Sequence, residues 1–192
     1  WIETMSALEE VEAATAAAKT TGLPVMATMT FDTAGRSMMG VPPADYAQFA
    51  VEHGLHGYGA NCGIGPAELM EAVLGIKKNN APFLIAKGSC GIPSYQDGAI
   101  HYHGTPELMA EYAVLARDAG VKIIGGCCGT SPEHVAAMHK ALAERPQEGD
   151  VDMARLIAGP GKPWKDLPTS PHESGTSVGA SGRRQRRRPT RR

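Results

Sequence analysis

The 192-residue sequence has no apolar run near the roughly 18 residues that a membrane-spanning helix needs. Its first residues show no basic stretch followed by an apolar segment and a small-residue cleavage site, so nothing in them indicates secretion. Four cysteines are too few for a disulfide scaffold in a chain of this length. These absences predict a cytoplasmic protein without membrane contact, whose thiols stay reduced.

Charge is unevenly distributed along the sequence. The formal net charge is −1, but segment 182–192 contains seven of the 19 Lys and Arg, so the other 12 face 20 Asp and Glu. We therefore predict an acidic folded domain over 1–158 and a flexible basic tail over 159–192. Because no aromatic residue alternates with the arginines, we expect no nucleic-acid partner. A tail-mediated, nucleic-acid-binding accessory protein is kept as an alternative.

The rest of the sequence alternates short apolar runs with helical segments. The runs lack strict polar alternation, which is typical of strands buried on both faces of a parallel sheet. Predicted strands cover 1–4, 24–29, 55–60, 82–87 and 121–126. Predicted helices cover 5–22, 44–54, 65–78, 106–119 and 133–144. This order predicts an α/β protein and leaves a doubly wound sheet and a (β/α)₈ barrel both open.

The number and placement of the predicted elements bear on this choice. Five strands are fewer than the eight of a closed barrel. The long loops 30–43 and 88–104 follow predicted strands, so they lie at the carboxyl ends where the active sites of barrels gather. If the fold is a barrel, the missing strands precede Trp1, and a first residue other than Met predicts that the chain begins inside a longer protein.

Three of the four cysteines follow predicted strands. Cys62 follows one strand, and the adjacent Cys127 and Cys128 follow another. Because the carboxyl ends of parallel strands meet at one edge of a sheet, we expect all three sulfur atoms at that edge. Neighbouring residues of a regular strand point to opposite faces, so the backbone must bend for Cys127 and Cys128 to converge. The three glycines of the same stretch permit such a bend.

Three converging thiolates suit Zn²⁺, which prefers four ligands in tetrahedral geometry. Three protein ligands leave one position open, as in catalytic zinc sites. An all-sulfur shell favours a substrate thiol at that position over the activation of water. On the pattern alone, ordinary buried cysteines and a strained disulfide between Cys127 and Cys128 stay open as alternatives.

The stretches "GGCCGTSPEH" (125–134) and "GANCGIGP" (59–66) together resemble the homocysteine S-methyltransferase family. This family includes betaine–homocysteine methyltransferases and the homocysteine domain of methionine synthase. The resemblance runs from Trp1 to about residue 145. It implies an α/β (β/α)₈ TIM barrel, of which this chain holds a carboxyl-terminal portion, about strands 4–8, followed by a disordered basic tail. It also implies that Zn²⁺ is held by Cys62, Cys127 and Cys128.

The resemblance further implies the substrates and their contacts. Homocysteine would bind zinc through its sulfur and take a methyl group, giving methionine. Glu3 matches the family glutamate that holds the substrate's amino group, and Asn61 would shape the substrate pocket. Betaine is the donor we expect, because the chain resembles bacterial betaine-type members more than cobalamin-linked ones. The complete protein is therefore expected to be a methyltransferase.

Several expectations concern partners and secondary residues. An N-terminal half-barrel chain or a second copy of this chain would complete a barrel, and the alternative is a zinc- or thiol-binding fragment without catalysis. Ser89 stands where many relatives have Asn, which leaves the role of that position undefined. We expect Cys90 to be a packed thiol, and His101 and His103 to be a surface pair rather than metal ligands.

Overall fold

The computed structural model describes residues 1–77 and 81–160, and in these ranges it contains seven strands and six helices. The strands are β1 (Ile2–Met5), β2 (Met26–Met29), β3 (Gly57–Cys62), β4 (Leu84–Gly88), β5 (Ser94–Gln96), β6 (Ala99–His101) and β7 (Ile123–Gly126). The helices are α1 (Leu8–Lys19), α2 (Pro43–Glu52), α3 (Pro66–Lys77), α4 (Pro106–Asp118), α5 (Pro132–Glu144) and α6 (Met153–Ala158). The predicted α/β alternation is confirmed.

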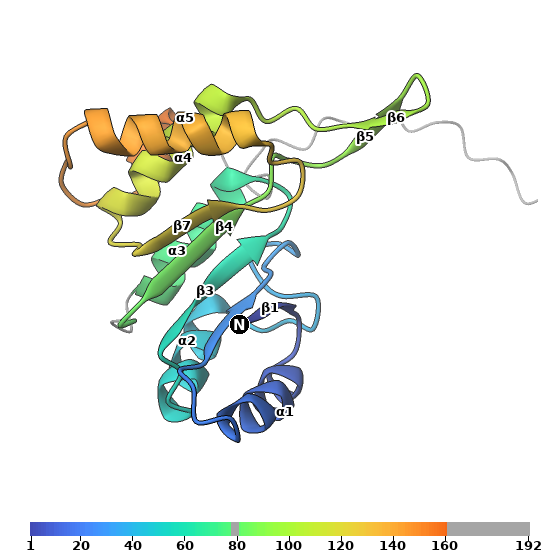
Figure 1. Cartoon of the computed structure of the whole chain (residues 1–192), viewed down its shortest axis with the longest axis vertical. Helices are drawn as coiled ribbons and strands as arrows, with labels where there is room; N and C mark the ends of the chain where they lie inside the picture. The colour runs from blue at the N-terminus through green and yellow to red at the C-terminus, as the bar shows by residue number, and fades with distance from the viewer. Residues whose placement is uncertain (78–80, 161–192) are drawn as a thin grey trace, which may run out of the picture.

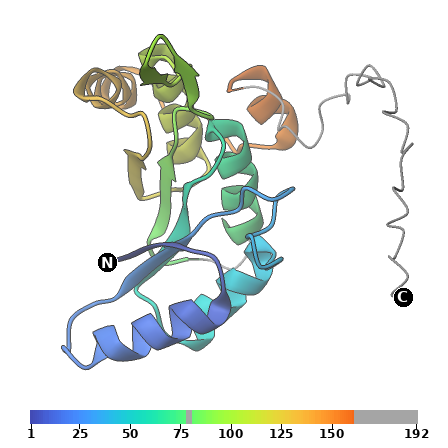
Figure 2. The same ribbon diagram turned by 90° about the vertical axis from the view of Figure 1, so that its right-hand side faces the viewer.

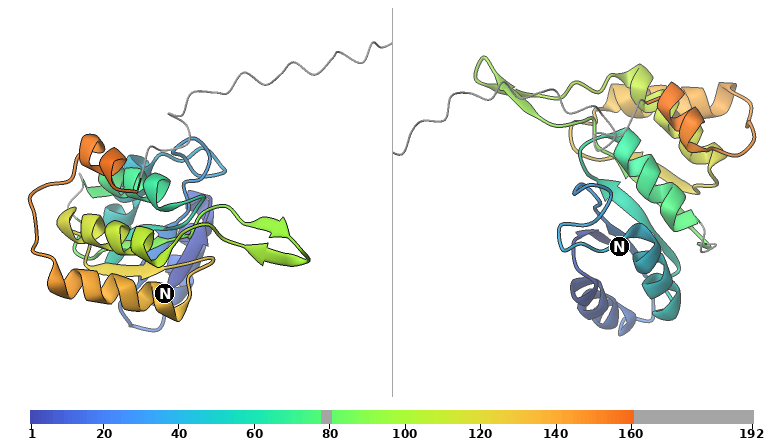
Figure 3. Two further views of the ribbon diagram at one scale, coloured as in Figure 1. Left: turned by 90° about the horizontal axis from the view of Figure 1, so that it is seen from above. Right: turned by 180° about the vertical axis from the view of Figure 1, so that it is seen from behind.

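Five strands form one parallel sheet in the order β1-β2-β3-β4-β7, which follows their order along the chain (Figure 1). A doubly wound sheet reverses its strand order at a switch point, and the described strands show no such reversal. Helices α2 and α3 lie behind the sheet in Figure 1 and in front of it in the right panel of Figure 3. The described part is therefore a singly wound parallel sheet with these helices on one face.

Aromatic side chains join α2 to the sheet. Tyr46 of α2 is fully buried, and its hydroxyl donates a hydrogen bond of 2.7 Å to the backbone oxygen of Ala27 on β2. Its ring meets that of Tyr58 on β3 edge-on, with 6.3 Å between the centroids. Burial of such large rings dominates the energetics of a core. Tyr58 therefore marks the face of β3 that is turned toward the helices.

The alternation of side chains along a strand then identifies the residues of the opposite face. Asn61 lies three positions after Tyr58, so it points away from α2. In the register of the sheet Asn61 pairs with Lys87 on β4, and Lys87 pairs with Gly125 on β7. Figure 2 shows the sheet with α2 and α3 on one side and the N-terminus on the other. A polar row thus lies on the face that these two helices leave uncovered.

One hairpin and one helix were not predicted from the sequence. The predicted loop 88–104 contains the hairpin of β5 and β6, whose turn residues Asp97 and Gly98 both have positive φ, 50° and 83°. Asp-Gly is a strong signal for such a two-residue turn, and it was overlooked. The second missed element is α6, which ion pairs from Arg155 and Arg117 to the buried Asp118 help to hold.

Three further sequence predictions concern the length of a helix, membrane-spanning segments and the domain boundary. Helix 5–22 was predicted too long, because α1 spans only Leu8–Lys19. Among the described helices, none has both the length and the apolar character needed to span a bilayer. Most of the predicted tail, residues 161–192, lies outside the described residues, so the domain boundary after 158 stays a prediction.

Candidate metal centre

Three cysteine sulfur atoms gather at the carboxyl edge of the sheet. The Sγ atoms of Cys62, Cys127 and Cys128, hereafter the three-cysteine cluster, all lie within 4.8 Å of one another. The Sγ atoms of Cys62 and Cys128 are 3.5 Å apart. All the cysteines are free, so the structure has no disulfide between Cys127 and Cys128. The structure thus brings together residues that are 65 positions apart in the sequence.

Cys62 ends β3 in an unusual backbone conformation. Its φ is 64°, in the left-handed region, and Gly63 follows with φ 78°. A non-glycine residue in this region costs about 1 kcal/mol, and such strain is concentrated at functional sites. Regular alternation would direct Cys62 to the same face as Tyr58 and Ala60, toward the helices. The left-handed turn ends that alternation and leaves the thiol half-buried at the edge of the sheet.

A tight turn presents the two adjacent cysteines. The Cys127 N–H still donates to the Gly88 oxygen of β4 (2.7 Å), and the Thr130 N–H donates back to the Cys127 oxygen (3.2 Å). The third residue of this turn is Gly129, with φ 75°, the value that a type II turn requires there. The bend predicted from the glycines is therefore present, and it explains how Cys128 leaves the direction of β7.

The spacing of the three sulfur atoms is close to that of a tetrahedral zinc site. With Zn–S bonds near 2.3 Å, tetrahedral geometry separates two sulfur ligands by about 3.8 Å. The observed spacing, 3.5 Å for one pair and at most 4.8 Å for all three, requires only small side-chain movements to reach this value. Cys128 is exposed, which gives a metal and a further ligand access from solvent. The three thiols therefore fit a zinc ion with one position left for a non-protein ligand.

The burial and close packing of the thiols affect the pKa values of the cluster. Burial, and then the neighbouring Cys128 and Cys127 thiols, raise the pKa of Cys62 to about 12. Burial and the adjacent cysteines also raise the pKa of Tyr102. Its ring packs on the turn so closely that a Cβ atom added to Gly129 would lie 2.3 Å from the Tyr102 Cγ. Without a metal ion the Cys62 thiol is thus protonated at neutral pH.

Asn61 connects three parts of the site. It is 1% exposed, and its Oδ1 accepts hydrogen bonds from the Thr4 N–H (2.9 Å) and the Thr28 hydroxyl (2.7 Å). Its Nδ2 donates to the Thr4 hydroxyl (2.7 Å) and lies 4.0 Å from the Cys127 sulfur. The amide therefore fixes β1 and β2 to the end of β3, next to the cluster. This is a scaffold role in addition to the pocket role that the resemblance implies.

Glu3 lies on the same side of the sheet and is engaged by a residue that the sequence analysis missed. The Lys87 ammonium group forms an ion pair with Glu3 and lies 5.8 Å from the centroid of the Trp1 ring. The side chains of Glu3 and Lys87 are 33% and 25% exposed. The available signal was a charged residue at the end of an otherwise apolar strand, "FLIAK" (83–87). Such a residue needs a partner when it points away from solvent.

The fourth cysteine belongs to the packing around the cluster. Cys90 is fully buried, and its sulfur lies 3.5 Å from the Thr130 hydroxyl. Ser89 is 1% exposed and donates a 3.0 Å hydrogen bond to the Gly91 oxygen. His103 lies 3.0 Å from the Ser94 hydroxyl. Among the described residues, only the three-cysteine cluster groups enough Cys, His, Asp or Glu ligands to hold a metal ion.

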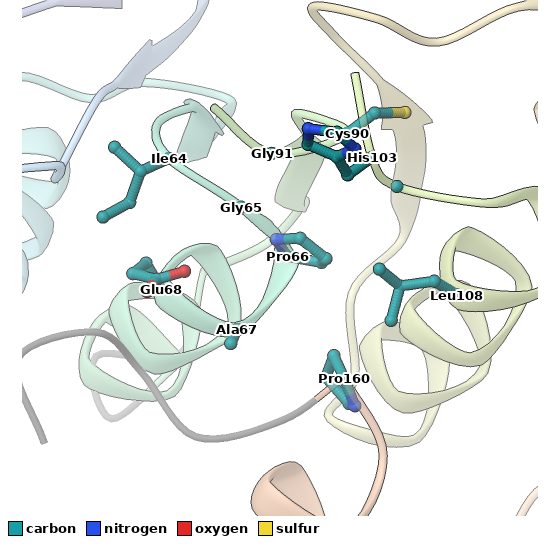
Figure 4. Close-up of a pocket in the computed structure, with 11 residues that line it drawn as sticks. Ile64, Gly65, Pro66, Ala67, Glu68, Cys90, Gly91, His103, Leu108 and Pro160 are labelled. Atoms are coloured by element: carbon teal, nitrogen blue, oxygen red, sulfur yellow. The ribbon is translucent and has the colours of Figure 1, made fainter. Parts of the chain in front are cut away.

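A neighbouring pocket of about 230 Å³ lies between the beginnings of α3 and α4 (Figure 4). Figure 4 shows the Cys90 sulfur turned away from its centre. None of the three clustered cysteines lines it. Its lining is formed by Ile64, Gly65, Pro66, Ala67, Glu68, Cys90, Gly91, His103, Gly104, Leu108 and Pro160. This pocket is therefore separate from the candidate metal centre.

Comparison with known proteins identifies the class of this site. The profile of the family described as homocysteine S-methyltransferase matches residues 1–142. The chain therefore belongs to the homocysteine S-methyltransferase family, and the resemblance drawn from the cysteine motifs is confirmed.

Individual relatives agree with the family assignment. Betaine–homocysteine S-methyltransferase 1 of Mus musculus is 30% identical over 181 residues, covering 85% of this chain and 44% of that protein. Methionine synthase of Mycobacterium leprae is 31% identical over 131 residues, covering 67% of this chain and 11% of that protein. The crystal structure of the homocysteine methyltransferase MmuM from Escherichia coli, in its apo form, is similar in fold. Its TM-score is 0.56 at 20% identity, covering 72% of this chain and 48% of that chain. The chain thus spans less than half the length of each of these proteins.

Proposed function

We propose that this chain supplies the zinc-binding portion of an enzyme that transfers a methyl group from betaine to homocysteine, giving methionine. The single observation that carries the proposal is the convergence of the three sulfur atoms within 4.8 Å in a chain of this family. Membership alone would not distinguish a functional site from a degenerate one. The intact cluster supports a site that still holds metal.

Each group of the site has a stated role in the proposed reaction. Cys62, Cys127 and Cys128 would hold Zn²⁺, which would keep a bound substrate thiol deprotonated at neutral pH. Glu3 accepts the substrate's α-ammonium group, as the resemblance implies. The sulfur of homocysteine then forms a bond to the methyl carbon while the bond from that carbon to the quaternary nitrogen breaks. The electron pair stays on nitrogen, so the neutral amine leaves without a general acid. No general base is needed either, because the thiol would already have lost its proton to solvent on binding Zn²⁺.

Betaine is proposed as donor because the betaine-using relative covers 85% of this chain. Methionine synthase of Mycobacterium leprae has a similar identity, 31%, over a smaller share of this chain, 67%. Other methyl donors are therefore outcomes of the experiment. A cationic donor is chemically suitable, because a neutral amine leaves more readily than an anion. Donor choice is therefore measured directly by comparing betaine with a methyl sulfonium compound and a methylated folate.

The proposal includes a complete (β/α)₈ barrel. Sequential parallel order and the fold likeness to MmuM support the sheet as part of a barrel wall. In the described part, β1 and β7 each pair with one neighbour and present a free strand edge. Further βα units, from a segment that precedes Trp1, from another chain or from another copy, would pair with these two edges and close the barrel. Size-exclusion chromatography coupled to light scattering measures whether the chain associates in this way.

The test of the metal centre uses Co²⁺ in place of Zn²⁺, because thiolate-to-cobalt charge transfer gives an absorption band that reports sulfur ligation. We expect one Co²⁺ per chain and a further spectral change when homocysteine is added. Cys127→Ala should weaken metal binding more than about 100-fold, beyond the effect of removing an outer-shell group. Cys90→Ala is the matched control and should leave the spectrum unchanged, since Cys90 is outside the cluster.

The outcomes separate the proposed function from its alternative. Metal binding without any homocysteine-induced change indicates a zinc-binding fragment without catalysis. Equal metal binding by Cys127→Ala and the unaltered chain would overturn the proposed centre. Methionine formation with betaine, lost in Cys127→Ala and kept in Cys90→Ala, supports the full proposal in any assembly that contains this chain.

A further inference from the structure

The ion pair between Glu3 and Lys87 crosses the uncovered face of the sheet. Glu3 is on β1 and Lys87 is on β4, which are separated in the sheet by β2 and β3. Both side chains must therefore point into the space in front of the sheet to meet. The Lys87 stem lies over β7, where a Cβ atom added to Gly125 would be 3.4 Å from its Cγ.

Lys87 also stands next to the metal centre in the sheet register. Gly88, the next residue, pairs with Cys62 on one side and Gly126 on the other. A strand advances about 3.3 Å per residue. The Lys87 backbone thus lies about one strand residue before the level of Cys62 in the sheet. That is the length scale of the two methylene groups between the thiol and the amino-acid end of homocysteine.

We propose that Lys87 is the residue that recognises the α-carboxylate of the amino-acid thiol, while Glu3 takes its α-ammonium group. This inference rests on the proposed function, which supplies the thiol substrate and the role of Glu3. In the structure the two side chains pair with each other. The zwitterionic end of the substrate replaces that pair by two pairs of the same kind, one with each residue.

Charge balance supports this arrangement over a purely structural ion pair. A carboxylate and an ammonium group that are each about one-quarter to one-third exposed lose part of their hydration and need partners. A zwitterion offers one group of each sign and leaves neither residue unpaired. A substrate lacking its carboxylate would leave Lys87 without a partner, and such a loss is the strongest source of discrimination in polar sites.

The experiment measures thiol binding by the Co²⁺-loaded chain with three probes. Homocysteine has both charged groups, 3-mercaptopropylamine lacks the carboxylate, and 4-mercaptobutanoate lacks the ammonium group. The variant is Lys87→Met, which keeps much of the apolar stem. Lys77→Met is the matched control, because Lys77 is 35% exposed, also pairs with a carboxylate (Asp150, 2.8 Å) and ends α3 rather than facing this site.

Lys87→Met should weaken homocysteine binding about 10-fold to 100-fold, the range for a hydrogen bond between charged groups. It should leave 3-mercaptopropylamine binding unchanged or tighten it, because Glu3 no longer has a competing partner. The preference for homocysteine over 3-mercaptopropylamine should therefore collapse. Lys77→Met should keep the preference of the unaltered chain. Glu3→Gln should show the converse loss, reducing the preference for homocysteine over 4-mercaptobutanoate.

Two results would overturn the inference, and they differ from failure of the proposed function. In one, Lys87→Met binds both thiols as before, and in the other it loses affinity for homocysteine and 3-mercaptopropylamine equally. Either result leaves the preference ratio unchanged and would show that Lys87 only neutralises or supports Glu3. Failure of the unaltered, metal-loaded chain to bind homocysteine would refute both the proposed function and this inference. A melting temperature measured for each variant distinguishes loss of recognition from loss of folding.

Discussion

Replacement of Asn61 by Ala tests whether this amide supports the metal centre. The change removes three hydrogen bonds of 2.7–2.9 Å: one from the Thr4 N–H, one to the Thr4 hydroxyl and one from the Thr28 hydroxyl. Thr4 is exposed, so water can replace its two bonds, and each loss costs about 0.5–1 kcal/mol. Thr28 is fully buried, so its orphaned hydroxyl adds about 1–3 kcal/mol. The expected total is about 3 kcal/mol, a large part of the stability of a typical domain.

A double-mutant cycle gives this prediction its control. Thr28→Val alone keeps the shape of the side chain and removes one bond, so it should cost about 1 kcal/mol. In the Asn61→Ala background, Thr28→Val removes a hydroxyl that has already lost its partner. The free energy of unfolding should therefore rise again by about 1 kcal/mol. The coupling between the two sites is then about 2 kcal/mol.

The free energies of unfolding come from urea titrations followed by far-ultraviolet circular dichroism, with an unchanged slope against urea as the test of two-state behaviour. Co²⁺ affinity of the same variants reports on the cluster, because the Asn61 amide lies 4.0 Å from the Cys127 sulfur. Additive costs within about 0.5 kcal/mol, or a loss below about 1 kcal/mol for Asn61→Ala, would refute the assignment of Asn61 as the scaffold of the site.

Two further substitutions test local features of the fold. Gly129→Ala should cost about 1–3 kcal/mol and weaken metal binding, because φ is 75° and the new Cβ would lie 2.3 Å from Tyr102. Gly98→Ala is the matched control, because Gly98 also has a positive φ, 83°, but a Cβ atom added there would meet no atom within 4 Å. Urea titrations measure the stability of both variants, and Co²⁺ titrations measure their metal affinity. An equal loss of metal affinity in the two variants would contradict this account. Asp118→Asn should cost about 2 kcal/mol near pH 7. Burial opposes ionisation of Asp118, but hydrogen bonds from Arg155 and Arg117 outweigh it and lower its pKa. The stability that these ion pairs contribute is present above the unfolded pKa of about 3.9 and is lost as the pH falls through the lower folded pKa. The free energies of unfolding of Asp118→Asn and the unaltered chain, measured by urea titration, should therefore converge in acid. A difference that persists in acid would argue against this assignment.

The order of strands and helices was readable from local sequence, because apolar runs and helix-favouring segments carry it residue by residue. The boundaries of the elements were not, as α1 shows: the helix ends at Lys19, three positions before Gly22. The hairpin of β5 and β6 was missed because its strands have three residues each and bury little apolar surface. Short exposed strands leave almost no hydrophobic pattern, so only their Asp-Gly turn was available as a signal.

For the candidate site too, the sequence by itself determined one part and the tertiary structure decided the rest. The cysteine motifs by themselves determined the family, since adjacent thiols among glycines after one strand and a single thiol after another are a specific combination. Tertiary structure alone decided that Lys87 meets Glu3 and that Asn61 joins three strands, because these partners are 84 and up to 57 positions apart. Such contacts depend on how the strands are ordered and curved. No local pattern of polar residues records that geometry.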